Sequence, residues 1–223
     1  MVRLLGVGKQ YSNCRYVLRN ISFDLHKGEF AYVTGVSGAG KTTLLKLLFG
    51  MEKASEGQIY VNNRDLGSLN KNRLFQYRRE VGFVFQDFKL LPDLTVFDNV
   101  SLPLEIRNMS PKEIDYRVKG VLSLVGLSDR ADDYPPVLSG GEQQRIAIAR
   151  SIVGKPSLLL ADEPTGNLDS TNAREVMALF QEIREMGTTV LIATHDEALM
   201  QMFPTRTIEL QHGEMMADKG AAK

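Results

Sequence analysis

A glycine-rich segment followed by a lysine and a threonine carries the clearest chemistry in this sequence. Residues 35–42 read Gly-Val-Ser-Gly-Ala-Gly-Lys-Thr, which matches the phosphate-binding pattern G-x-x-x-x-G-K-[ST]. Such a loop turns backbone N–H groups and a helix N-terminus toward a β-phosphate. The lysine reaches the β- and γ-phosphates, and the hydroxyl binds Mg²⁺. The predicted nucleotide-binding residues are Gly35, Ser37, Gly38, Ala39, Gly40, Lys41, Thr42 and Thr43.

A second candidate site follows a hydrophobic run. The run Leu158-Leu159-Leu160-Ala161 ends in Asp162 and Glu163. A strand that ends there places both acids at the carboxyl edge of its sheet, where ligands of open α/β folds bind. Taken alone, two acids after a strand are more often a surface turn. Together with the phosphate loop, they predict that Asp162 holds Mg²⁺ through water and that Glu163 orients and deprotonates an attacking water.

A third segment distinguishes among P-loop enzymes, because a kinase or a GTPase would fit the first two segments equally well. Residues 138–144 read Leu-Ser-Gly-Gly-Glu-Gln-Gln and precede a predicted helix from Arg145 to Ile152. A serine and two glycines at a helix start form a second anion site, although an ordinary N-cap at Ser139 would have the same residue type. In these residues the sequence resembles the ATP-binding cassette family, whose signature motif reads in the same way.

The resemblance implies a composite site that two chains share. In the family, the residues at Ser139, Gly140 and Gly141 bind the γ-phosphate of the ATP held by the other subunit. Asp169, in the segment Asn167-Leu168-Asp169, corresponds to the loop that crosses the dimer. The resemblance therefore implies a homodimer with ATP at its interface, and hydrolysis of ATP to ADP and phosphate as the reaction.

Three further residues take roles from the same resemblance. Gln86 corresponds to a glutamine that contacts Mg²⁺ and the water and senses a membrane partner, and His195 to a histidine that contacts the γ-phosphate. Tyr11 lies where the family places an aromatic ring on adenine; Tyr16 is near, and a core role for either tyrosine is an alternative. The expected cofactors are ATP and Mg²⁺. The expected catalytic residues are Lys41, Gln86, Glu163 and His195, and the expected metal-site residues are Thr42, Gln86 and Asp162.

The strands and helices that must position these residues are predicted to form an α/β fold. Four apolar runs lack clean alternation, which favours strands buried on both faces of a largely parallel sheet. Amphipathic patterns after Lys41, after Gly141 and over Ala173–Met186 predict helices that cover this sheet. The predicted strands are Phe30–Thr34, Val81–Phe85, Ser157–Ala161 and Thr189–Thr194.

The first part of the chain has a different pattern. Its stretches are short, alternating or β-branched, and we expect turns at Lys27-Gly28 and Glu56-Gly57. This pattern predicts an antiparallel β layer beside the parallel core. The stretches are Val2–Val7, Asn20–Leu25 and Gln58–Asn62.

The middle of the chain is predicted to be helical. Between about Asp87 and Val137 the strand pattern stops, and Pro111 opens a helical pattern. We therefore expect one ATPase domain over residues 1–223, with a helical subdomain inserted at about 87–150. Ala217–Lys223 reads as a loose tail.

Composition limits the classes of partner. Lys+Arg and Asp+Glu both number 27, so there is no broad basic field, and nucleic acid is not an expected partner. The single cysteine, Cys14, excludes an intrachain disulfide and cannot form a metal site by itself. No segment approaches the ~18 uninterrupted apolar residues that span a bilayer, and the N-terminus does not read as a secretory signal. We expect a cytoplasmic protein held at the inner face of the cell membrane through its partner.

Within the family, the flanks of the motifs look most like the bacterial cell-division branch, whose membrane partner controls peptidoglycan hydrolysis. The ATPases of lipoprotein release and of MacB-type efflux share nearly all of these residues and remain the alternative. A soluble cassette protein acting on DNA or ribosomes is disfavoured, because such proteins typically carry a long coiled coil between the motifs or two cassettes in one chain, and this sequence shows neither. A scaffold with negligible turnover is disfavoured because Glu163, Gln86 and His195 are all present.

Contact with the membrane subunit is expected around Gln86. Apolar residues follow it closely and could form a groove for a helix of the partner. The equally weighted alternative is that each of them forms the inner face of the helical subdomain. These residues are Phe88, Leu90, Leu91, Leu94 and Phe97.

Overall fold

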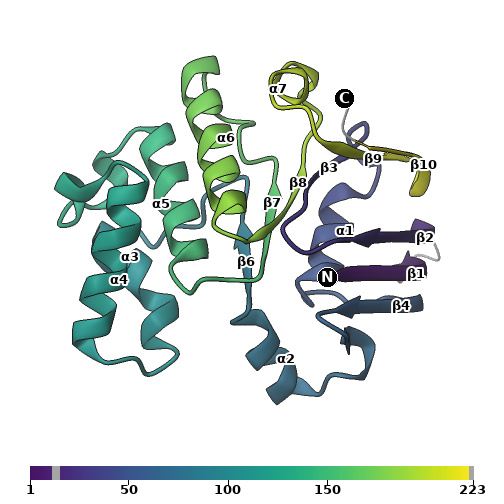
Figure 1. Cartoon of the computed structure of the whole chain (residues 1–223), viewed down its shortest axis with the longest axis horizontal. Coiled ribbons are helices and arrows are strands. Elements are labelled where there is room, and N and C mark those ends of the chain that lie inside the picture. Colours follow the sequence, from purple (N-terminus) through teal and green to yellow (C-terminus); the bar gives the residue numbers. More distant parts are fainter. Residues whose placement is uncertain (12–15, 221–223) are drawn as a thin grey trace.

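The computed structural model describes residues 1–11 and 16–220, so Cys14 lies outside the described residues. Two sheets form in this part of the chain (Figure 1). The larger has the strand order β10-β9-β3-β8-β7-β6 and the smaller β2-β1-β4-β5. The strands are β1 Val2–Gln10, β2 Tyr16–Leu25, β3 Phe30–Thr34, β4 Glu56–Val61, β5 Arg64–Asp65, β6 Val81–Val84, β7 Leu158–Asp162, β8 Thr189–Ala193, β9 Arg206–Gln211 and β10 Glu214–Lys219.

The larger sheet is parallel from β9 through β3, β8 and β7 to β6, and β10 pairs antiparallel with β9. Its strands are buried on both faces. In β7, Leu159 and Ala161 belong to one hydrophobic cluster, whereas Leu158 and Leu160 belong to the other. Burial on both sides explains why these runs show no alternation. The predicted α/β class with a largely parallel core sheet is confirmed.

Helices cover one face of the larger sheet, and a helix together with the smaller sheet covers the other. Residues of α3 to α7 pack in the first cluster, and residues of α1, β1, β2 and β4 pack in the second. Polar side chains cap several helix starts, including Ser110, Ser139 and Asp169. The helices are α1 Lys41–Leu48, α2 Lys71–Arg78, α3 Val96–Glu105, α4 Pro111–Leu124, α5 Gly140–Ile152, α6 Ser170–Glu185 and α7 Glu197–Met202.

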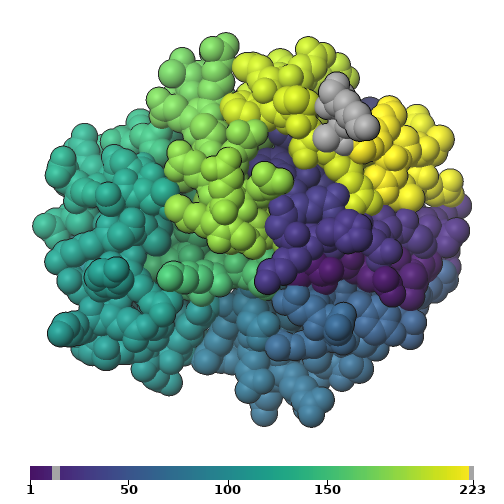
Figure 2. All heavy atoms as spheres, in the orientation of Figure 1, coloured from purple at the N-terminus to yellow at the C-terminus, as the bar shows by residue number. Residues whose placement is uncertain are grey.

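The segment between β6 and β7 is helical. All of its residues are described, and it contains helices and turns but no strand. Helices α3, α4 and α5 pack on one another at the side of the molecule away from the smaller sheet (Figure 1). In the space-filling view the segment that contains them forms a continuous teal block beside the green α6 segment (Figure 2).

The smaller sheet confirms the antiparallel pairing, with one correction. Glu56 and Gly57 do not form a turn but begin β4. Gly57 has φ +76°, and the register between β1 and β4 shifts between Leu5 and Gly8. A Cβ on Gly57 would lie 2.3 Å from the carbonyl oxygen of Gly6. The glycine therefore permits a bulge inside a strand, which has the same sequence signal as a turn.

The expected loose tail from Ala217 is wrong over the described residues. Strand β10 continues to Lys219 and pairs with β9. Its anchor is Arg206, whose Nε and Nη2 donate to Asp218 Oδ1 and Oδ2 at 2.8 and 2.7 Å. The same guanidinium donates to Glu29 Oε1 at 2.8 Å. The terminal segment is thus tied to the core by a bidentate pair that its polar composition did not reveal.

We expect Asp218→Asn to lower the free energy of unfolding by roughly 1 kcal/mol at neutral pH. The Arg206 guanidinium holds the pKa of Asp218 below its usual value of 3.8. A lowered folded-state pKa means that this stabilisation is present above pH 3.8 and is lost as the pH falls through the folded-state value. Urea denaturation of both proteins at neutral and acidic pH measures the difference in their free energies of unfolding. A difference that persists unchanged at acidic pH contradicts the assignment, and Asp115→Asn, an exposed i,i+4 pair with Lys119, serves as the small-effect control.

Candidate functional site

The phosphate loop connects β3 to α1, as its motif requires. Gly35 has φ +141°, and a Cβ there would lie 2.1 Å from the carbonyl oxygen of Leu210 in β9. Gly40, with φ +106°, is the N-cap residue of α1. Because these two positions admit only glycine, the backbone can turn its N–H groups inward at the end of β3.

Lys41 is nearly buried and points back over the loop. Its Nζ donates to the carbonyl oxygen of Gly35 at 2.7 Å and lies 3.4 Å from Glu163 Oε1. Only 8% of the Lys41 side chain is exposed. A buried ammonium with these partners supplies positive charge at the centre of the loop, where phosphate oxygens would meet it.

Asp162 ends β7 beside the loop. Thr42 Oγ1 donates to Asp162 Oδ1 at 3.0 Å. Burial raises the pKa of Asp162, and the Thr42 hydrogen bond opposes that shift. A cation beside this carboxylate would compensate its lost hydration. Mg²⁺ commonly binds through one or two carboxylates and substrate phosphates, so a buried carboxylate next to a hydroxyl fits it without the larger His/Cys/Asp/Glu clusters that the described residues lack.

Glu163 directly follows β7 and is bonded to the neighbouring strand β8. Its N–H donates to Ala193 O of β8 at 2.8 Å, and its φ of +46° is rare for a residue with a side chain. Its Oε1 lies 2.9 Å from His195 Nδ1 and 3.4 Å from Lys41 Nζ. Strained backbone held in place by neighbours is common at functional sites. The fold therefore brings together Lys41, Glu163 and His195, which lie far apart along the chain.

A cavity of about 330 Å³ forms around these groups. Gly35 and Asp162 do not line the cavity, but they are hydrogen-bonded to the lining residues Lys41 and Thr42. Its lining residues are Val17, Ser37, Gly38, Ala39, Gly40, Lys41, Thr42, Thr43, Gln86, Glu163 and His195.

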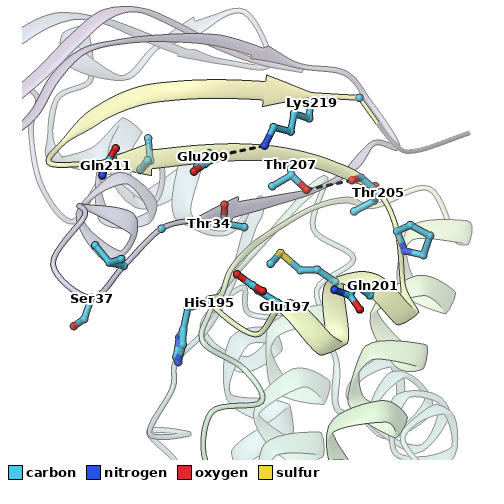
Figure 3. Close-up of a pocket in the computed structure, with 16 residues that line it drawn as sticks. Thr34, Ser37, His195, Glu197, Gln201, Thr205, Thr207, Glu209, Gln211 and Lys219 are labelled. Atoms are coloured by element: carbon cyan, nitrogen blue, oxygen red, sulfur yellow. Dashed lines mark hydrogen bonds and ion pairs between the residues drawn. The ribbon is translucent and has the colours of Figure 1, made fainter.

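A larger cavity of about 1070 Å³ lies next to it and shares Ser37 and His195 (Figure 3). It opens between α7 and the β9–β10 hairpin, where Lys219 Nζ donates to Glu209 Oε2 at 3.2 Å. Lys41, Thr42 and Glu163 do not line it. The smaller cavity, and not the larger one, therefore brings together the predicted catalytic residues Lys41, Glu163 and His195.

Tyr11 and Tyr16 do not line the smaller cavity. Tyr11 is 37% exposed, and the Lys9 ammonium lies 4.9 Å from the centre of its ring. The Tyr16 hydroxyl donates to Glu56 Oε1 at 2.5 Å. The Tyr11 ring is exposed, so its stacking on adenine stays a prediction. Tyr16 is instead bonded to Glu56 within the smaller sheet.

The serine and glycines of the third segment begin α5, away from this cavity. Ser139 and Glu142 form a capping box: Glu142 Oε2 accepts from Ser139 N and Oγ at 2.9 and 2.7 Å. These bonds lower the pKa of Glu142. Gly141 packs so closely on α6 that a Cβ would lie 2.2 Å from Asn172 Oδ1. Ser139 and Gly140 themselves remain exposed.

Asp169 caps the neighbouring helix. Its Oδ1 accepts from the N–H groups of Thr171 and Asn172 at 2.9 and 3.0 Å. The bonds from Asn172 lower the pKa of Asp169. In the same loop, Asn167 Nδ2 donates to Gln86 O at 3.2 Å, so the Gln86 segment and the Asn167–Asp169 segment are joined within one chain.

Three residues that hold these segments had no predicted role. Gln144 Nε2 donates to Pro164 O at 2.6 Å. Arg150 donates to the carbonyl oxygens of Phe88 and Lys89, both at 2.8 Å, and Asn99 bonds both backbone groups of Leu91. In the sequence, each of these residues is visible only as a polar side chain within an apolar helical pattern, and such a pattern does not specify which group the side chain will bond.

The apolar residues after Gln86 divide between two environments. Leu90 and Phe97 pack against the cluster under the helices. Leu91 is 41% exposed, and Gln86 is exposed. Leu90 and Phe97 therefore fit the alternative that these apolar residues form the inner face of the helical segment. Leu91 and Gln86 are exposed and remain available for a partner.

Comparison with known proteins identifies the family. The family model described as ABC transporter matches residues 18–166. The chain belongs to the ATP-binding cassette family. It is 46% identical to the cell division ATP-binding protein FtsE of Bacillus subtilis (98% of this chain, 96% of that protein) and 48% identical to FtsE of Haemophilus influenzae (96% and 98%). FtsE of Escherichia coli K12 is 45% identical over 99% of each chain.

Solved cassettes agree with this assignment. The dimeric post-hydrolysis structure of the cassette MJ0796 bound to ADP and Pi is 37% identical, covers 100% of both chains and superposes with a TM-score of 0.90. CbiO1 from Clostridium perfringens, part of the ABC transporter complex cbiONQ, is 29% identical with a TM-score of 0.91 (98% of this chain, 88% of that chain). The chain is an ATPase of the cassette type. Among its described helices none is long and apolar enough to cross a membrane.

We expect Thr42→Val, which removes Oγ1 at nearly constant volume, to abolish most of the gain in nucleotide affinity that Mg²⁺ provides. The loss of the donor to Asp162 should also destabilise the protein by about 1 kcal/mol. Titration with a fluorescent ATP analogue, with Mg²⁺ and with EDTA, measures the ratio of the two affinities. Thr42→Ser keeps the hydroxyl and should keep the ratio; an unchanged ratio in Thr42→Val would remove Thr42 from the metal site.

Proposed function

We propose that this cassette is the ATPase of a cell-division complex, in which two copies enclose two ATP molecules and drive an FtsX-like membrane protein that controls peptidoglycan hydrolysis. The observation that carries the ATPase part is the convergence of Lys41, Glu163 and His195 on one cavity beside the Thr42–Asp162 pair. Relatives named FtsE over nearly the full chain support the cell-division part.

The residues of one chain divide the hydrolytic work. The phosphate loop and Lys41 bind the β- and γ-phosphates. Glu163 takes the proton of the attacking water, and His195, 2.9 Å from Glu163, holds that carboxylate and contacts the γ-phosphate. Because phosphoryl transfer mainly requires positioning and charge stabilisation, fixing Glu163 between an ammonium and an imidazole is the central contribution of the fold.

Thr42, Asp162 and Gln86 are the residues that would hold Mg²⁺. When bound, the metal neutralises charge on the phosphate oxygens. Thr42 and Asp162 are already joined by a 3.0 Å hydrogen bond, and Gln86 lines the same cavity. Gln86 lies at the exposed end of this set, where a change in the membrane subunit could move it.

A second chain supplies the remaining part of the proposed site. Ser139 and Gly140 lie exposed at the N-terminus of α5, and they do not line the cavity of their own chain. A helix N-terminus attracts phosphate. We therefore assign Ser139, Gly140 and Gly141 to the γ-phosphate held by the partner, and Asp169 to the loop between the two chains. Cassettes described as dimeric support this arrangement.

The proposed membrane contact lies around Gln86. Leu91 is exposed close to it, and Asn99 and Arg150 fix the backbone between them. The chain would thus work at the cytoplasmic face of the membrane, held there by its partner. A lipoprotein-release or MacB-type transporter would use the same surface and is the competing outcome of the partner experiment below.

We expect Glu163→Gln to lower kcat by roughly 100-fold or more while leaving ATP binding intact, because the amide cannot accept the proton but keeps the size and shape of the side chain. The variant should accumulate as a dimer when ATP and Mg²⁺ are present. Phosphate release and light scattering measure the two effects. Glu182→Gln, an exposed glutamate on α6, is the matched control and should behave as wild type. A monomeric Glu163→Gln protein with bound ATP would contradict the shared site.

Affinity capture from detergent-solubilised native membranes, using Glu163→Gln with ATP and Mg²⁺, tests the partner. We expect an FtsX-like protein with a large extracellular domain among the retained proteins. Wild-type protein without nucleotide is the control. Recovery of a lipoprotein-releasing or efflux permease instead would assign the cassette to transport and overturn the cell-division role.

A further inference from the structure

Helix α5 is tied directly to the loop that carries Glu163. The tie is Gln144, which lies one turn after Gly141 and is fully buried. Its Nε2 donates to the carbonyl oxygen of Pro164 at 2.6 Å. Pro164 follows Glu163 in the chain. A single side chain thus joins the helix that begins with Ser139 to the residue next to the catalytic carboxylate.

Packing alone does not account for a glutamine at this position. Its Oε1 is buried and has no hydrogen-bond partner among the described residues. A buried acceptor without a partner is costly, and an apolar side chain of the same length would avoid that cost. The neighbouring residues Ile146, Ala147 and Ile148 are buried and apolar. The glutamine therefore keeps one bond at the expense of an unsatisfied atom.

The bond reaches a segment whose conformation is unusual. Glu163 has φ +46°, so its carboxylate direction depends on how the backbone on both sides is held. Ala193 O holds the N–H of Glu163 at 2.8 Å, and Gln144 holds the carbonyl of Pro164 at 2.6 Å. The first bond comes from the core sheet and the second from the helical segment.

We propose that Gln144 is a positioning residue for Glu163, which makes turnover in one chain depend on the placement of its own α5. This inference rests on the proposed function, in which the start of α5 docks on the ATP of the other chain. Movement of α5 on docking is passed through Gln144 to Pro164, and so to Glu163. Each chain then links the nucleotide it touches through Ser139 to the nucleotide it hydrolyses.

Gln144→Met tests this link, because methionine keeps the length of the side chain and removes both polar atoms. We expect kcat to fall roughly 10- to 100-fold, as for a small misplacement of a catalytic group. KM for ATP and the affinity for a fluorescent ATP analogue should not change. The melting temperature should shift by less than about 3 °C, since the lost bond is offset by removal of the unpartnered Oε1. Ile148→Val, which removes a buried methyl from the same helix, is the control and should keep wild-type kcat.

Dimerisation separates positioning from a merely structural role. In the Glu163→Gln background, Gln144→Met should leave ATP-dependent dimer formation intact, because Gln144 is proposed to act on the carboxylate and not on Ser139. Wild-type kcat in Gln144→Met would overturn the proposal, as would a parallel loss of dimer and kcat. If the Glu163→Gln protein with Gln144 intact does not dimerise with ATP, and the wild-type protein does not hydrolyse ATP, the proposed function fails instead. Gln144→Leu repeats the measurement should Gln144→Met not fold.

Discussion

The convergence of Lys41, Glu163 and His195 on one cavity depends on the parallel alignment of β3, β7 and β8. Because the carboxyl ends of parallel neighbours meet at one edge, Lys41, Glu163 and His195 come together although their segments are far apart in the chain. Parallel strands need cover on both faces. The helices on one side, and α1 with the smaller sheet on the other, meet that need and hold the edge rigid.

The same edge concentrates charge in a nearly buried place. The ammonium of Lys41 and the carboxylate of Glu163 are 8% and 13% exposed, so their mutual attraction is screened less than on the surface. Asp162 lies alongside, and burial raises its pKa. A ligand that carried both negative phosphates and a divalent cation would suit this site, because each half of that ligand would compensate one sign of the buried charge.

Helix α5 connects three parts of the proposed cycle. Its start presents Ser139 to solvent, its middle holds Pro164 through Gln144, and its end holds the backbone after Gln86 through Arg150. A rigid helix with three attachments can transmit a displacement that a flexible loop would absorb. The segment between β6 and β7 therefore does more than cover the sheet: it joins the backbone after Gln86, the exposed residues at the start of α5 and the segment that carries Glu163.

The sequence by itself determined the fold class, the family and the order of the motifs, because each motif is a local pattern whose residue types follow from its chemistry. It did not determine that Glu56 and Gly57 lie inside a strand, or that β9 and β10 complete the sheet. A glycine signals a positive φ without saying whether a turn or a bulge uses it. Only the tertiary structure decided the pairs Arg206–Asp218, Gln144–Pro164 and Glu163–His195. Their partners are 12 to 32 residues apart in the chain, and a polar residue specifies its partner only after packing has brought the two together.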